Sequence, residues 1–315
     1  MGEPGRGLVL RRFAGALWPA PVEADVNRHP LSARGCSMKF RWFVVTLLLQ
    51  AMVLGCQSGL FSPAQSSAVS GKEECLHTIL ERGALRVAMS GTQPPLSMRN
   101  AKGELVGLDV DLARALADAM RVELEIVELP FSGLLDALER GDVDLVVSSL
   151  TITPTRNARV AFAGPYMISG SSLLTRDEVL DELLSVADLD SPERSWAALE
   201  GSTGQALIAE AFPLARFVSI EDQEVAVERV LDGEIDGLIA DLPFVEYTVS
   251  RYADRGLATF QRPFTTEPLG VALPPNSPLF ANLVQNYLNT LDATGELMHM
   301  KMRWLSVGGE LGAQP

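Results

Sequence analysis

Two stretches of the chain resemble one another. Residues 139–147 read ERGDVDLVV, and residues 231–239 read LDGEIDGLI. Each begins as the end of a helix, stops at a glycine and continues through an acidic residue into an apolar run, which is typical of a buried strand. This echo predicts two similar α/β lobes with one equivalent strand each. The alternative is that any junction of helix, glycine and strand looks alike.

The sequence around the first stretch alternates between strand and helix patterns. We predict strands over 85–89, 122–126 and 143–147, and helices over 109–120 and 132–140. Apolar residues recur at helical spacing over 109–120, whereas apolar and acidic residues alternate over 122–126. Such alternation favours a mostly parallel sheet covered by helices.

The composition limits the class of protein. The chain has 315 residues, of which 47% are hydrophobic and 21% charged, as expected for a globular protein with a buried core. Its net charge of −14 argues against nucleic acid as a partner. The three cysteines form no CxxC pair and the three histidines are scattered, so we predict no metal site, no cofactor and no Ser-His-Asp triad.

The N-terminal part has the features of a targeting segment. Residues 38–55 combine a basic start with an apolar run, which indicates a signal peptide and is too short for a comfortable membrane span. Residues 1–37 show no periodicity, and we interpret them as an upstream extension produced by a misassigned start codon. Residues 56–75 are predicted to form a flexible tether.

A small residue directly before Cys56 resembles the lipobox of bacterial lipoproteins. The resemblance implies that Cys56 becomes the first mature residue and carries a lipid that anchors the protein to a membrane. Cleavage by an ordinary signal peptidase within residues 66–68 is the alternative.

The segment after the first predicted strand carries candidate ligand-binding residues. Thr153 followed by Pro154 predicts the start of a helix, which places Arg156 in the first turn. A helix N-terminus and a guanidinium both favour anions, so this segment is a candidate carboxylate receptor. Ser149 and Thr151 are two residues apart and would add hydroxyl donors on the same side. The alternative is that Arg156 is a solvated surface residue.

The second lobe offers a complementary group. Asp241 follows the second strand and could pair with a ligand ammonium, or it could simply cap a helix. Ser202 and Thr203 lie in a glycine-flanked turn whose amides and hydroxyls could bind an anion. Phe131 could stack on a ligand or fill the core of its lobe.

Asp109 and Asp111 form a pair of carboxylates directly after Gly107, where a helix is predicted to begin. Capping and dipole roles are therefore favoured for both over a role in ligand binding.

These stretches in their order resemble bacterial extracellular solute-binding proteins of family 3, the binding proteins of amino-acid ABC importers. The resemblance covers roughly residues 76–305 and rests on several short segments: 85–89, 94–95, 107–113, 138–144, 151–156, 164–166, 295–297 and 301–304. It implies an α/β fold of two lobes, the type II periplasmic-binding-protein fold. Lobe 1 would comprise 76–168 and 271–315, lobe 2 would comprise 175–264, and the hinge strands would be 169–174 and 265–270.

The resemblance also implies site roles and partners. Arg156 would hold the ligand carboxylate beside the Ser149 and Thr151 hydroxyls, and Asp241 would hold the ammonium. The glycine turn with Ser202 and Thr203 would contribute from lobe 2, and Phe131 would pack on the ligand. The expected protein is a monomeric, exported binding protein, not an enzyme, that delivers an amino acid to an ABC permease from the periplasm or cell surface.

The sequence departs from the family in two places. Gln93 and Leu96 flank the Pro-Pro pair where the family has an aromatic residue, and residues 194–200 replace a Val-rich strand. Two alternative functions remain open. One is a periplasmic dehydratase on the same fold, with Glu267 as its candidate general acid. The other is a ligand-sensing subunit of a signalling system.

Overall fold

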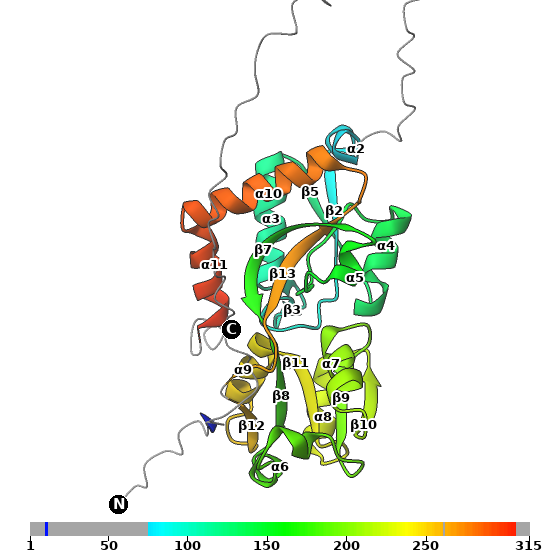
Figure 1. The fold of residues 1–315 in the computed structure, drawn as a ribbon. Helices are drawn as coiled ribbons and strands as arrows, with labels where there is room; N and C mark the ends of the chain where they lie inside the picture. The colour runs from blue at the N-terminus through cyan, green and yellow to red at the C-terminus, as the bar shows by residue number, and fades with distance from the viewer. Residues whose placement is uncertain (1–9, 12–74, 261, 307–315) are drawn as a thin grey trace, which may run out of the picture. The chain divides into compact units, whose positions relative to one another are not determined.

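Two mixed β-sheets form the framework of the protein in the computed structural model (Figure 1). The structure describes residues 10–11, 75–260 and 262–306. The predicted signal peptide, Cys56 and nearly all of the predicted tether and upstream extension lie outside these ranges.

The first sheet has the strand order β5-β2-β6-β13-β7. Its strands are β2 (Ala84–Met89), β5 (Glu123–Glu128), β6 (Leu145–Val146), β7 (Ala161–Ser169) and β13 (Glu267–Leu273). Strand β2 runs parallel to β5 and β6, whereas β13 runs antiparallel to β6 and β7. The sheet is therefore mixed rather than mostly parallel, because β7 and β13 connect to the other lobe and run in opposite directions.

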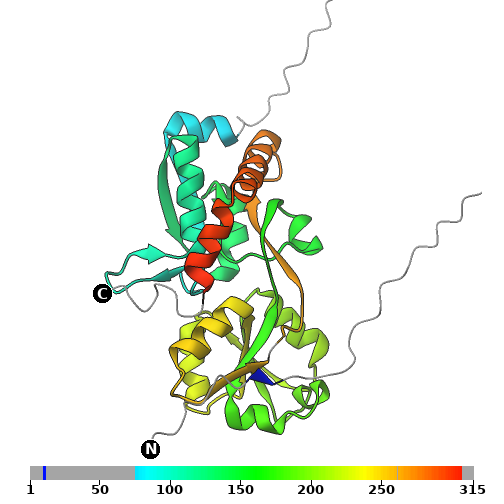
Figure 2. The same cartoon turned by 90° about the vertical axis from the view of Figure 1, so that its left-hand side faces the viewer.

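Helices from both ends of the described chain cover this sheet. They are α2 (Cys75–Arg82), α3 (Leu108–Met120), α4 (Leu134–Arg140), α5 (Pro154–Asn157), α10 (Pro278–Ala293) and α11 (Glu296–Leu305), with a short helix η1 (Phe131–Gly133) before α4. Helix α11, red in Figure 2, packs against α3 and α10. The C-terminal helices thus complete the lobe that the N-terminal half of the described chain begins.

The second sheet has the order β1-β12-β8-β11-β9-β10. Its strands are β1 (Leu10–Arg11), β8 (Ser171–Arg176), β9 (Ser195–Leu199), β10 (Arg216–Ile220), β11 (Gly237–Asp241) and β12 (Leu257–Phe260). Its helices are α6 (Asp177–Glu182), η2 (Val186–Leu189), α7 (Thr203–Ala211), α8 (Gln223–Leu231) and α9 (Leu242–Arg251). Strand β8 is antiparallel to both of its neighbours, so this sheet is mixed as well.

The helix and strand patterns of the sequence reappear in the structure. The predicted helix 109–120 is α3, and its apolar stripe is buried. The predicted strand 122–126 is β5, whose exposed and half-buried residues largely alternate. A short hairpin of β3 (Met98–Arg99) and β4 (Leu105–Val106) precedes α3.

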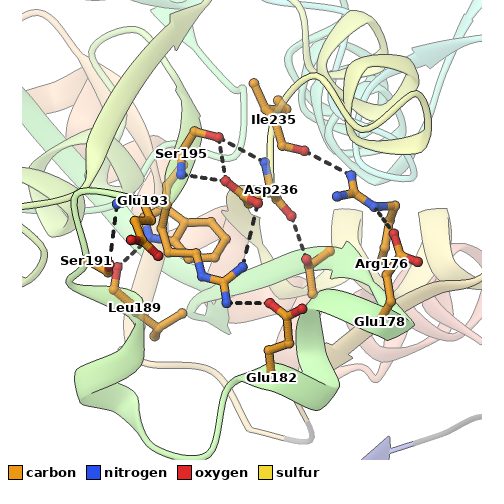
Figure 3. A network of polar contacts seen from close by, with 12 residues as sticks. Arg176, Glu178, Glu182, Leu189, Ser191, Glu193, Ser195, Ile235 and Asp236 are labelled. Carbon is orange, nitrogen blue, oxygen red and sulfur yellow. Dashed lines mark hydrogen bonds and ion pairs between the residues drawn. The ribbon is translucent and has the colours of Figure 1, made fainter.

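The echo between residues 139–147 and 231–239 is a structural equivalence. Each contains a helix end, a left-handed glycine and a strand that pairs in parallel with another strand of its lobe, β6 with β2 and β11 with β9. In the first lobe Asp144 accepts a hydrogen bond from the backbone N–H of Arg86 at 2.8 Å. In the second, Asp236 accepts one from the N–H of Ser195 at 2.8 Å and another from its hydroxyl (Figure 3). The prediction of two similar lobes is confirmed.

Two connections link the sheets and lie side by side. Gly170 joins β7 to β8, and residues 262–266 lead into β13. The N–H of Ser171 donates to Thr265 Oγ1 at 2.8 Å, and the N–H of Phe264 donates to the Ser171 carbonyl at 2.7 Å. A Cβ atom on Gly170 would lie 2.1 Å from the Thr265 carbonyl oxygen, so the close approach requires glycine.

None of the helices in the described ranges is long and apolar enough to cross a membrane.

Candidate functional site

A cavity at the carboxyl ends of the strands brings all seven predicted site residues together. Its volume is about 20 Å³, which is room for about one water molecule. The predicted residues that line it are Phe131, Ser149, Thr151, Arg156, Ser202, Thr203 and Asp241. The first four belong to the first lobe and the last three to the second, so the cavity lies between the lobes.

Arg156 supplies the positive charge of the site. Thr153 caps helix α5 by accepting a hydrogen bond from the N–H of Arg156, as predicted. The guanidinium donates to the carbonyl of Thr151 at 2.9 Å and to that of Gly201, in the other lobe, at 3.0 Å. It lies 5.7 Å from the centre of the Phe131 ring.

The charge of Arg156 is not neutralised by a neighbouring side chain. It forms no ion pair with any described carboxylate, whereas Arg99, Arg251 and Arg303 each pair with one. Burial lowers the pKa of Arg156, and the more distant Asp241 and Glu267 only partly oppose that effect. A half-buried guanidinium in this situation has donors left for an anionic group.

Asp241 supplies the opposite charge. It stands at the N-cap position of α9, but its side chain makes no capping bond. Instead its carboxylate accepts a hydrogen bond from the Ser149 hydroxyl of the other lobe at 2.6 Å. Burial raises the pKa of Asp241 to about 7, despite the opposing effect of this hydrogen bond. The alternative that the Asp241 side chain caps helix α9 is therefore wrong.

Glu267 accepts four hydroxyl hydrogen bonds close to the cavity. Its donors are Thr151 at 2.7 Å, Thr203 at 2.6 Å, Ser171 at 2.7 Å and Thr265 at 2.6 Å. Burial raises the pKa of Glu267, but the hydroxyl donors outweigh it and leave the pKa below its ordinary value. The carboxylate therefore ties both lobes and a connection together in its ionised form.

Comparison with known protein families shows the class of protein to which this chain belongs. The family of bacterial extracellular solute-binding proteins, family 3, matches residues 85–307. The chain belongs to this family. The arginine-binding protein 1 of an ABC transporter of Escherichia coli (strain K12) is 27% identical over 226 residues, covering 70% of this chain and 90% of that protein.

Two further relatives of this solute-binding protein differ in kind: one is a binding protein and the other is an enzyme. A binding component of an ABC transporter from Wolinella succinogenes, solved in complex with lysine, is 33% identical with a TM-score of 0.68, covering 71% of this chain and 97% of that one. The cyclohexadienyl dehydratase of Pseudomonas aeruginosa is 24% identical over 240 residues, covering 76% of this chain and 89% of that enzyme. The relatives of the chain thus include an enzyme among mostly binding proteins.

Asp109 has a different role from the predicted one. Helix α3 is capped at Gly107 without a side-chain bond, and Asp109 is fully buried. Its carboxylate accepts hydrogen bonds from the Tyr166 hydroxyl and from the N–H of Ser149, both at 2.7 Å. It therefore positions Ser149, whose backbone has a left-handed φ of 48°. Burial raises the pKa of Asp109 to about 7.

Asp111 also binds outside its own helix turn. It accepts hydrogen bonds from Trp304 Nε1 at 2.8 Å and from Arg303 at 3.0 Å, so it anchors α11. In the sequence, a carboxylate near the start of a helix indicates a cap. The partners named here for Asp109 and Asp111 lie 40 or more positions away along the chain, so local sequence patterns could not identify them.

Phe131 is buried in an apolar core cluster and also lines the cavity, where its ring lies 5.7 Å from the Arg156 guanidinium. Its packing in the core is confirmed, and its stacking on a ligand stays a prediction. Ser202 caps α7 by accepting from the N–H of Gln205 at 3.1 Å.

Two other cavity residues, Gln93 and Gln223, carry no binding signal in the sequence. Gln93 stands out only because it occupies a place where the family has an aromatic residue. A larger cavity of about 480 Å³ borders the same segments, and its lining includes Thr92, Pro94, Arg99, Asp222, Glu224, Arg251 and Arg303.

Proposed function

We propose that this protein captures a free amino acid between its lobes and delivers it to an ABC permease. The observation that carries the proposal is the pair formed by Arg156 and Asp241. They come from opposite lobes, line one cavity and are unpaired with any described residue of opposite charge.

An α-amino acid matches this arrangement at both of its ends. Its carboxylate would accept hydrogen bonds from Arg156, and its ammonium would pair with Asp241. A zwitterion leaves water at great cost unless both charges are met, so the site favours ligands that carry both groups. The arginine-binding and lysine-complexed relatives support an amino acid as the ligand class.

Binding requires the lobes to separate and close again. A cavity of about 20 Å³ is too small for an amino acid, so the ligand enters when the lobes are apart. The contacts of Ser149 with Asp241 and of Arg156 with Gly201 would break on opening. We assign the hinge to residues 169–174 and 265–270, where two connections pack side by side.

Glu267 supports binding rather than dehydration as the activity. A general acid must hold a proton at the working pH, whereas four hydroxyl donors lower the pKa of Glu267 and keep it ionised. The candidate acid of the enzymatic alternative is thus occupied in holding the lobes together.

We further propose that the protein is exported by residues 38–55 and held at the membrane by a lipid on Cys56, with the tether giving reach to the permease. Mass spectrometry of the mature protein from its native cell should find a lipid-modified Cys56. An unmodified N-terminus within residues 66–68 would contradict the anchor.

A thermal-shift screen of the full-length protein tests the ligand class. We expect amino acids to raise the melting temperature, since a ligand at a hundred times its Kd adds about 2.7 kcal/mol of stability. Small dicarboxylates and sugars should leave the melting temperature unchanged. A protein stabilised by a sugar and by no amino acid would refute the proposal.

A further inference from the structure

Gln223 is a buried amide whose oxygen has no hydrogen-bond partner among the described residues. It is the first residue of α8, its side chain lines the inner cavity, and the residue is 4% exposed. Its Oε1 atom is fully buried and has no hydrogen-bond partner among the described residues. Buried polar groups in proteins are nearly always paired, so this amide calls for a partner in the cavity.

Gln93 faces the same cavity from the other lobe. It is 6% exposed, and its Oε1 atom accepts hydrogen bonds from the hydroxyls of Ser90 and Ser148, both at 3.0 Å. These two donors fix the oxygen toward the protein. The amide nitrogen of Gln93 has no partner among the described residues, and it is left as a donor for whatever enters.

The two glutamines stand where the inner cavity borders the larger one. The neighbours of Gln93, Thr92 and Pro94, line the larger cavity, and so do the neighbours of Gln223, Asp222 and Glu224. Because Arg156 and Asp241 are assigned to the two charged ends of the ligand, this border is the place left for its side chain.

We propose that Gln93 and Gln223 bind the side chain of the ligand and select a carboxamide, as in glutamine. This inference rests on the proposed function. A ligand carboxamide can donate to Gln223 Oε1 while its own oxygen accepts from the amide nitrogen of Gln93 or Gln223. A carboxylate has only acceptors and so leaves Gln223 Oε1 without a donor. An ammonium has only donors and so leaves the amide nitrogen of Gln93 without an acceptor.

The larger cavity offers few free acceptors to a long cationic side chain. Asp222 and Glu224 are the carboxylates that line it, and the lining arginines Arg99, Arg251 and Arg303 are each paired with a carboxylate. Glu224 is already paired with Arg251 at 3.0 Å, and Asp222 caps α8 through the N–H of Glu224 at 2.8 Å. An apolar side chain would bury both glutamine amides without partners.

Titration calorimetry on the full-length protein tests the selection. Glutamine should bind at least about tenfold more tightly than glutamate, lysine or norleucine, the loss expected for one unmade hydrogen bond. Gln223→Leu should weaken glutamine binding by about tenfold or more and leave alanine binding within about twofold. Because an unpaired amide is removed, this variant should melt no lower than the wild type in the absence of ligand.

Gln285→Leu is the matched control. Gln285 accepts a hydrogen bond from the N–H of Gly164 at 2.8 Å and lines neither cavity, so its loss should not change glutamine affinity. Equal affinity for glutamine and lysine, or glutamine binding unchanged in Gln223→Leu, would overturn the selection while amino-acid binding stands. Failure of every amino acid to bind would overturn both proposals.

Discussion

At the scale of single residues, the site consists of two charges without partners of opposite charge among the described residues. Arg156 donates to two backbone carbonyls, and Asp241 receives one hydroxyl from the opposite lobe. Neutral partners leave both charges uncompensated, so under the proposed function a zwitterionic ligand stabilises both groups. The consequence is visible at Asp241, whose pKa is raised to about 7 by burial.

The raised pKa of Asp241 predicts that binding releases a proton below neutral pH. At pH 6 the carboxyl is mostly protonated, and a ligand ammonium favours the ionised form, so the proton must leave on binding. Affinity should fall by about tenfold per pH unit below about 7 and level off above it. Calorimetry at pH 6 in two buffers of different ionisation enthalpy measures the proton released.

Asp241→Asn provides the control for this linkage. Asp109 titrates near the same pH, but it binds Tyr166 and Ser149 and does not line the cavity. The asparagine variant should therefore bind more weakly and release no proton. Proton release that persists in this variant would assign it to Asp109 instead.

The site was predictable where local rules apply and not where distant partners decide. The start of helix α5 contains Thr153, Pro154 and Arg156 within four positions. Their arrangement could therefore be predicted from the sequence. Asp109 also stands at the start of a helix, where the sequence favours a capping role. Its carboxylate instead accepts hydrogen bonds from Ser149 and Tyr166, because the fold buries it beside them. No sequence pattern marks Gln223 as a binding residue. Its distinguishing feature is the buried Oε1 atom, which has no hydrogen-bond partner among the described residues.

At the scale of elements, the repeated helix–glycine–strand unit builds each lobe. Its acidic residue, Asp144 or Asp236, accepts a hydrogen bond from a backbone N–H of the neighbouring parallel strand, Arg86 in β2 or Ser195 in β9. Arginines accompany both acids: Arg86 pairs with Asp144 and Arg194 lies 3.7 Å from Asp236. The same device therefore places the carboxyl ends of β6 and β11 at the cavity.

Removing this acid should destabilise the lobe without touching the cavity. Asp236→Ala leaves the buried N–H and hydroxyl of Ser195 without their acceptor, so we expect a loss of about 1–3 kcal/mol in the free energy of unfolding. Denaturant titration measures it. Asp232→Ala, an exposed position at the end of α8, should cost less than about 0.5 kcal/mol. Equal effects of the two changes would contradict the assignment.

The elements themselves were largely predictable from periodicity. The apolar stripe of α3 and the alternation in β5 both reflect burial on one face. The direction of the connecting strands could not be predicted, because the periodicity of apolar residues does not show which strands pair or in which direction they run. The antiparallel β8 and β13 make both sheets mixed, although the helix–strand alternation favours parallel sheets.

At the scale of the whole binding unit, Glu267 joins the parts that must move. Its donors come from the first lobe, the second lobe and a connection: Thr151, Thr203 and Thr265. The bond with Thr203 crosses between the lobes, as do those of Ser149 with Asp241 and Arg156 with Gly201. These polar contacts beside the candidate site join the two lobes, and opening of the lobes must break them.

The most direct test compares an amino acid with the primary amine that lacks its α-carboxylate, on the wild type and on Arg156→Ala, by calorimetry. Arg159, which pairs with Glu139 and Asp136 on the surface, supplies the control Arg159→Ala. We predict that losing the carboxylate weakens binding by roughly a hundredfold in the wild type and in the control, but hardly at all in Arg156→Ala. A preference for the amino acid that persists undiminished in Arg156→Ala would contradict the role of Arg156 as the carboxylate receptor.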